Sequence, residues 1–274
     1  MLTDAPLREL REVVWEYYHS HARSMPWREE PTPYHVLVSE LMLQQTQVGR
    51  VLPKYREFMA RFPTIRAFTE ASLGDVLSTW SGLGYNRRAK FLHAAAQMVV
   101  RDFGGVVPDN VEDLVKLPGV GRNTAGAILA YAFNQPIVFI ETNVRTVFIH
   151  HFFADRTDVD DKELLPLVKL ACDPEHPREW YWALMDYGTH LKQTLGNNVS
   201  QSKHYVRQSK FEGSRRQIRG RILKHLTGGP RQAKELLRLE PDERTLSVLT
   251  DLTKEGFIEG KAGRLRLTES PKLP

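Results

Sequence analysis

Residues 117–122, with the sequence LPGVGR, constrain the fold of this chain more than any other segment. A helix-compatible run (111–116) precedes them, and a second run (124–133) follows. The link between the two predicted helices is too short for anything but a tight helical hairpin, in which glycine permits a positive φ and a close backbone approach. The second helix would begin with unpaired N–H groups at the positive end of its dipole, which can bind phosphate without reading base sequence. Taken alone, the pattern also fits a plain turn.

Helical periodicity continues through most of the chain up to about Leu195, and frequent proline and glycine residues separate the predicted helices. Strand-like alternation is nearly absent before residue 255. The body of the protein is therefore predicted to be all-α. Its predicted helices span residues 6–21, 33–45, 48–61, 73–80, 87–102, 112–116, 124–133, 143–153, 161–171 and 179–191.

The single cysteine, Cys172, excludes a disulfide framework and any metal site built from several cysteines. No apolar stretch has the length of a membrane span, and no signal-peptide pattern opens the sequence. We therefore expect an intracellular, cytoplasmic protein associated with the nucleoid rather than with a membrane. Nothing in the sequence suggests other than a monomer.

Positive charge is concentrated in the C-terminal quarter of the chain. Residues 203–274 contain 17 Lys and Arg against 9 Asp and Glu, whereas the preceding residues contain 21 against 24. A basic block attached to a mildly acidic body favours a polyanionic partner, here a nucleic acid.

The same C-terminal region has the pattern of a winged helix. Three helices are predicted at 215–226, 231–239 and 242–255, followed by a hairpin of strands 256–260 and 263–267 around Lys261-Ala262. Leu246, Leu249 and Leu252 are expected in its core. Such modules bind DNA through the third helix and the wing, although they also serve as protein-docking modules.

Several motifs gain meaning when they are taken together. They are Met25-Pro26-Trp27-Arg28, the stretch from Val38 to Val48, Gly82-Leu83-Gly84-Tyr85, the 117–122 hairpin, the stretch from Ile140 to Arg145, and Met185-Asp186-Tyr187-Gly188. As a set they resemble the helix-hairpin-helix (HhH-GPD) DNA glycosylase superfamily, and within it the MutY adenine glycosylase branch. The resemblance runs from about residue 7 to 195. It implies a mainly α, two-lobed glycosylase domain (1–195), followed by a polar and basic linker (196–213) and the winged-helix-like module (214–274).

The resemblance assigns chemistry to two carboxylates. Glu40 matches the family's general acid, which protonates a purine as the glycosidic bond breaks; the alternative is a buried acid paired with Arg28. Glu141 occupies the place of the catalytic carboxylate that stabilises an oxocarbenium-like sugar, and a helix N-terminus is expected to hold it ionised. The family residue there is almost always Asp, so the extra methylene of Glu puts the catalytic geometry in question. The alternative for Glu141 is a purely helix-stabilising acid.

Other positions carry over from the family in the same way. Asn143 matches an asparagine that hydrogen-bonds the catalytic centre, and Arg28 supports the site. Asn123 stands where bifunctional relatives carry a nucleophilic lysine, which implies a glycosylase without lyase activity. The residues expected to wedge into the duplex are Gln44, Gln45 and Thr46, and Tyr85 is expected beside the orphan base. The hairpin is expected to contact the DNA through Gly119, Val120, Gly121 and Arg122.

The chain departs from the branch in two further respects. It lacks the four cysteines of the usual iron–sulfur loop, so no cofactor is expected. It also ends in a winged-helix-like module in place of the branch's domain that checks for 8-oxoguanine. The sequence therefore predicts a monofunctional DNA glycosylase of base excision repair that acts on double-stranded DNA. Its base is adenine, opposite 8-oxoguanine or G. The alternatives are a thymine or uracil mismatch glycosylase and, in another class, a non-catalytic DNA-damage-binding protein.

Overall fold

The computed structural model describes residues 4–207 and 209–268, and within them the protein is mainly helical with one small C-terminal sheet. The chain forms two compact units. Unit 1 comprises Met1–Val36, Asp109–Val115 and Val120–Arg207. Unit 2 comprises Leu37–Pro108, Lys116–Gly119 and Gln208–Pro274.

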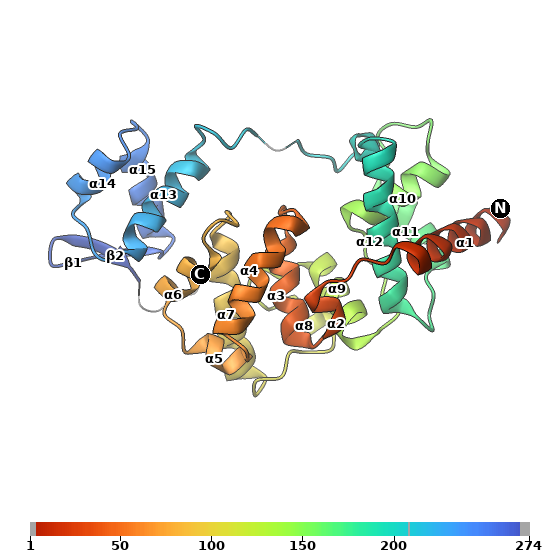
Figure 1. Ribbon diagram of the computed structural model, residues 1–274, viewed down its shortest axis with the longest axis horizontal. Coiled ribbons are helices and arrows are strands. Elements are labelled where there is room, and N and C mark those ends of the chain that lie inside the picture. Colours follow the sequence, from red (N-terminus) through yellow and green to blue (C-terminus); the bar gives the residue numbers. More distant parts are fainter. Residues whose placement is uncertain (1–3, 208, 269–274) are drawn as a thin grey trace. The chain divides into compact units, whose positions relative to one another are not determined.

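Unit 1 is a helical bundle in which the central helix α12 contacts α1, α9 and α10 (Figure 1). Its core is aromatic, with Phe148, Trp180 and Tyr181 fully buried. Gly188 of α12 allows the closest approach, because a Cβ there would lie 2.7 Å from the backbone oxygen of Asn143 on α10. The elements of this unit are α1 (Asp4–His21), α2 (Pro26–Glu29), α8 (Val111–Leu114), α9 (Arg122–Phe133), α10 (Thr142–Phe152), α11 (Asp161–Ala171), α12 (Pro177–Thr194) and the 3-10 helix η1 (Asn198–Gln201).

Local sequence signals explain where these helices begin and end. Asp160 and Glu163 form a reciprocal capping box at the start of α11. Pro177 occupies the first turn of α12, where its missing N–H leaves no bond unmade. Asn134 ends α9 in the left-handed conformation with a φ of 54°.

Unit 2 combines a second helical bundle with the C-terminal module. Phe58, Phe68 and Trp80 are buried in the bundle, and α13 of the module packs beside α6. The elements are the larger part of α3 (Pro33–Leu43), followed by α4 (Val48–Arg61), α5 (Ile65–Thr69), α6 (Leu73–Trp80), α7 (Arg87–Asp102), α13 (Arg215–Thr227), α14 (Ala233–Leu239), α15 (Thr245–Lys254), β1 (Ile258–Lys261) and β2 (Arg264–Leu267).

The C-terminal module has the predicted three helices and antiparallel hairpin, with two corrections. The hairpin turn is at Ala262-Gly263, one residue later than predicted, because both residues adopt the positive φ that a two-residue hairpin turn requires. Leu246 was expected in the core but is 63% exposed, whereas Leu249 and Leu252 are buried. The buried face of α15 also includes Thr245 and Val248, which leaves Leu246 on the solvent side.

No helix in the described part of the chain combines the length and the apolar character that crossing a bilayer would require.

Candidate active site

The first group of candidate residues lies at the N-terminus of α10 in unit 1. Glu141 is the residue immediately before the helix, and its side chain makes no capping hydrogen bond to it. Burial raises the pKa of Glu141 from 4.5 to about 7, and the neighbouring charge of Arg145 only partly offsets this effect. Burial therefore opposes the ionisation of Glu141 that a helix N-terminus favours.

Asn123 holds the backbone next to this carboxylate. Its side-chain nitrogen donates a hydrogen bond to the carbonyl of Ile140 at 2.9 Å, which ties the first turn of α9 to the residue preceding Glu141. From the other side, the Tyr181 hydroxyl donates to the Ile137 carbonyl at 2.9 Å. The segment that leads into Glu141 is thus anchored at two points.

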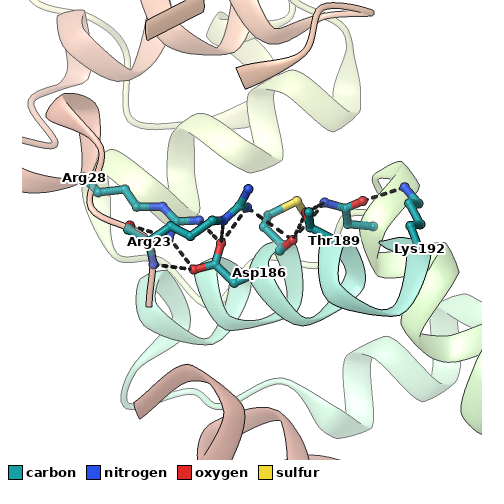
Figure 2. Close-up of polar contacts among 7 residues, drawn as sticks. Arg23, Arg28, Asp186, Thr189 and Lys192 are labelled. Atoms are coloured by element: carbon teal, nitrogen blue, oxygen red, sulfur yellow. Dashed lines mark hydrogen bonds and ion pairs between the residues drawn. The ribbon is translucent and has the colours of Figure 1, made fainter. Parts of the chain in front are cut away.

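Asn143 is engaged with α12 through both ends of its amide. The nitrogen donates to the Met185 carbonyl at 2.9 Å and to the Thr189 hydroxyl at 3.1 Å, and the oxygen accepts from the Lys192 ammonium at 2.6 Å (Figure 2). Burial lowers the pKa of Lys192 to about 8. Asn143 therefore fixes the first turn of α10 against α12.

Arg28 forms an ion pair with Asp186. Its two terminal nitrogens donate to the two Asp186 carboxylate oxygens, each at 2.8 Å, and Arg23 donates to the same carboxylate (Figure 2). Burial alone would raise the pKa of Asp186, but the hydrogen bonds and charges of Arg28 and Arg23 bring it below its ordinary value. The pair joins α2 to α12 inside unit 1.

Two features of the site were not predicted from the sequence: Lys192, and the ion pair of Arg145 with Asp161, whose two N–O distances are 2.7 Å. A signal for Lys192 did exist, because Met185, Thr189 and Lys192 repeat at the three- and four-residue spacing that puts them on one face of a helix. Asp186 was visible in the motif, but its partner Arg28 lies 158 residues away in the sequence.

The second group lies in unit 2 and surrounds the end of α3. Glu40 is on α3 between the buried Ser39 and Leu41, and its own side chain is partly exposed. Beyond the helix, Gln45 has a φ of 53° and is exposed to solvent. The side-chain nitrogen of Gln44 donates to the Gly119 carbonyl at 3.3 Å.

One buried arginine organises this second group. Arg88 on α7 donates to the carbonyls of Leu41 and Met42 at 3.0 and 2.8 Å, and to the Thr46 hydroxyl at 2.9 Å. It also donates to the carbonyl of Gly84 at 3.2 Å, beside Tyr85. Burial lowers its pKa to about 10, so it stays charged at neutral pH. Arg88 thus holds together the two loops expected to enter DNA, although no motif pointed to it.

The two glycines of the hairpin play different parts. Gly119 has a φ of 82°, and a Cβ there would lie 2.9 Å from the Cβ of Phe91, so both its conformation and its space require glycine. Gly121 has an ordinary φ of −88° as the N-cap of α9, and a Cβ there would meet no atom within 4 Å. Val120 is buried, whereas Arg122 is exposed at the first position of α9. The N-terminus of α9 is therefore open on the side where an anion would approach.

The residues present do not fit the iron–sulfur cluster of most MutY-branch proteins. A cluster requires cysteine ligands, and the one cysteine of the chain caps the end of α11. After α12, where the family's loop would lie, Gln201 donates to the carbonyls of Ala154 and Arg156, each at 2.8 Å, and Asn198 donates to the carbonyl of Thr146 at 3.0 Å. Side-chain amides therefore tie this segment to α10 and the loop that follows it. Residues 4–207 and 209–268 also bring no three His, Cys, Asp or Glu side chains together as metal ligands.

Comparisons with known proteins agree with the motifs. Residues 38–170 match the family model of the HhH-GPD superfamily of base excision DNA repair proteins. The chain is 49% identical over 136 residues to adenine DNA glycosylase of Mycobacterium tuberculosis H37Rv, covering 49% of this chain and 44% of that protein. It is 38% identical over 184 residues to adenine DNA glycosylase of Buchnera aphidicola from Acyrthosiphon pisum, covering 66% and 53%. The chain thus spans about half the length of the curated relatives it matches.

Solved structures share the fold at lower sequence identity. A thermostable thymine-DNA glycosylase superposes with a TM-score of 0.61 at 23% identity, covering 69% of this chain and 88% of that one. Endonuclease III in a non-covalent DNA complex superposes with a TM-score of 0.57 at 20% identity, covering 68% and 86%. The motifs and the relatives therefore agree: this chain is similar over residues 38–170 to the HhH-GPD superfamily of base excision DNA repair proteins, and it is similar to adenine DNA glycosylases over 49% to 66% of its length.

Proposed function

We propose that this protein is a DNA glycosylase that hydrolyses the N-glycosidic bond of a mispaired adenine in double-stranded DNA. The observation that carries the proposal is Glu141, a partly buried carboxylate at a helix N-terminus, held in place through Asn123 and Ile140 within a region similar to adenine DNA glycosylases. A carboxylate in such a site stabilises a developing positive charge far more strongly than it would in water.

The proposed reaction uses two acids in different protonation states. Glu40 donates a proton to a ring nitrogen of the extruded adenine, and the bond between the sugar C1′ and the base breaks with its electron pair leaving on the base. Ionised Glu141 stabilises the cationic sugar, and a water molecule then adds to C1′ and loses a proton to solvent, from which Glu40 regains the proton it gave to the base. The products are free adenine and an abasic site. Asn143 acts in this scheme as a positioning residue, because both ends of its amide bind α12.

We propose further that the enzyme leaves the abasic strand uncut. Asn123 has an amide, which cannot form a Schiff base with the sugar, and its nitrogen is hydrogen-bonded to the Ile140 carbonyl. Lys192 is the lysine of unit 1 with a lowered pKa, but its ammonium is bound to Asn143. Borohydride trapping on an abasic duplex tests this assignment, and a covalent adduct lost in Lys192→Ala would contradict it.

The C-terminal module supplies affinity for the DNA backbone in this proposal. Lys210, Lys224, Lys234 and Arg238 are exposed in a region with a large excess of basic residues. Phosphate contacts of this kind release counterions, so the affinity should fall steeply as salt is raised. A weak salt dependence that is unchanged by removing these charges would favour a protein-docking module instead.

The deciding experiment for the reaction uses labelled duplexes that carry A opposite 8-oxoguanine, A opposite G, T opposite G, or U opposite G. We expect strand breaks on the adenine duplexes only, and only after treatment with alkali. Glu40→Gln and Glu141→Gln should abolish the breaks while still binding the duplex. Breaks confined to T or U would establish pyrimidine excision, and binding without breaks on any duplex would establish a non-catalytic reader.

A further inference from the structure

Tyr85 lies in a loop whose backbone has little freedom. Gly82, Gly84 and Tyr85 have positive φ values of 99°, 73° and 47°, and the last is uncommon for a bulky side chain. The loop carbonyls at Leu83 and Gly84 accept hydrogen bonds from Arg88, whose guanidinium also lies 5.3 Å from the centre of the Tyr85 ring. The direction in which Tyr85 leaves the loop is therefore set by the protein.

A residue of the C-terminal module holds the other end of the Tyr85 side chain. Arg216, the second residue of α13, donates a hydrogen bond to the Tyr85 hydroxyl, and its guanidinium lies 5.3 Å from the ring centre. The second terminal nitrogen of Arg216 donates to the carbonyl of Ser209 at 2.7 Å and to its hydroxyl at 3.2 Å. Arg216 is thus itself fixed, and it contacts both the ring and the hydroxyl of Tyr85.

The module is anchored to the same bundle by contacts that do not involve Tyr85. Glu255, at the end of α15, accepts hydrogen bonds from Arg87 of α7 and Arg219 of α13. Its backbone carbonyl accepts from Lys90, whose ammonium lies 5.3 Å from the centre of the buried Phe257 ring. This partly buried cluster fixes α13 relative to the start of α7, and with it the distance from Arg216 to the loop of Tyr85.

We propose that Arg216 is a positioning residue for Tyr85, and that through this contact the C-terminal module helps to discriminate the base opposite the excised adenine. The inference rests on the proposed function and on the role that the family resemblance implies for Tyr85, insertion beside that orphan base. A tyrosine restrained at its ring and its hydroxyl loses little side-chain entropy on insertion, and its position can then distinguish orphan bases of different shape. If Arg216 instead kept Tyr85 away from the DNA, its removal would increase the discrimination between partner bases.

The test measures dissociation constants for uncleavable duplexes that carry a tetrahydrofuran abasic analogue opposite 8-oxoguanine, G, C or T. Four variants are compared with the wild type: Arg216→Ala, Arg216→Lys, Tyr85→Phe and the double variant Arg216→Ala/Tyr85→Phe. The control is Arg221→Ala, which removes the same charge from the same helix but from a residue paired with Glu240. A positive side chain that contacts only DNA phosphates does not distinguish bases, so the control should change the affinities for all four duplexes equally. Denaturant unfolding of each variant verifies that it is folded.

We expect Arg216→Ala to reduce the ratio between the best and worst partner base by about fivefold to tenfold, the effect of one ordinary hydrogen bond. Arg216→Lys should lie between Arg216→Ala and the wild type, and the double variant should be no worse than Arg216→Ala alone. An unchanged ratio in Arg216→Ala, a raised ratio, or equal loss in Arg221→Ala would overturn the inference. Because these duplexes are not cleaved, failure of adenine excision in the wild type would reject the proposed reaction without affecting the outcome of this test.

Discussion

Replacing Glu141 with glutamine separates the effect of its charge on the free energy of unfolding from its part in catalysis. The substitution keeps the size and the hydrogen-bonding oxygen of the side chain and removes its ability to ionise. Burial raises the pKa of Glu141 from 4.5 to about 7 in the native state. The folded protein therefore favours the neutral side chain, whereas the proposed chemistry needs the charged one.

The size of the effect on stability follows from linkage between protonation and folding. Between pH 4.5 and about 7 the native state retains a proton that the unfolded chain has released, so the free energy of unfolding falls as pH rises. A tenfold change in a protonation equilibrium is worth about 1.4 kcal/mol, and the raised pKa therefore corresponds to about 3 kcal/mol. Glu141→Gln should equal the wild type near pH 4 and be more stable by up to about 3 kcal/mol at about pH 8.

Urea denaturation at about pH 4, 6 and 8 measures this difference directly. Glu9→Gln is the matched control, because Glu9 is an exposed carboxylate on α1 of the same unit and its loss should change the stability by less than about 0.5 kcal/mol. In parallel, single-turnover excision by Glu141→Gln should fall by at least about a hundredfold. Affinity for the duplex should be retained.

Two results would refute this reasoning. A variant that is no more stable than the wild type at pH 8, with the same dependence on pH, would show that Glu141 carries no desolvation penalty. Excision at the wild-type rate would remove Glu141 from the chemistry. The expected combination, higher stability with lost activity, is typical of a side chain retained for function.

Three further predictions concern the pH profile, the hairpin and the buried ion pair. The single-turnover rate of the wild type should rise with pH through about 7 as Glu141 ionises, and a rate independent of pH in that range would argue against its proposed role. Gly119→Ala should lower the unfolding free energy by about 1–3 kcal/mol because of the clash with Phe91 and the positive φ. Gly121→Ala should lose less than about 1 kcal/mol but bind duplex more weakly, and equal stabilities of the two variants by urea denaturation would contradict this contrast. Asp186→Ala should lower stability by about 3–5 kcal/mol at neutral pH, because it leaves the buried Arg28 guanidinium without its counter-ion. Because the pKa of Asp186 is lowered in the native state, the wild type loses the same stabilisation as its carboxylate becomes protonated below pH 3.8. The deficit of the variant should therefore shrink below that pH. A deficit independent of pH would contradict the ion pair.

Short-range signals in the sequence were sufficient for the fold class and for most helices. Proline, glycine and capping residues mark helix ends because their effects act within one turn of the chain. The structure confirms the helical body and the three helices and hairpin of the C-terminal module. Boundaries were less exact, since α9 begins at Arg122 and not at Thr124, and the wing turn is at Ala262-Gly263.

The motifs also located the candidate site residues, but their assigned roles stay predictions. Glu40, Glu141 and Tyr85 could be named because the family's chemistry requires particular side chains at particular places along the chain. Leu246 shows the limit of this approach, since its apolar character does not say which face of α15 packs inward.

Only the tertiary structure decided how these residues are held and charged. The pKa of Glu141 depends on the atoms packed around it, and no property of the residue or its sequence neighbours reports that desolvation. Arg88 reaches carbonyls more than forty residues away, and Arg216 meets Tyr85 across 131 residues. Local sequence determines helices and turns because those interactions act within a few residues of the chain. Burial, ion pairing and the contact between Tyr85 and the C-terminal module arise only when distant segments pack together.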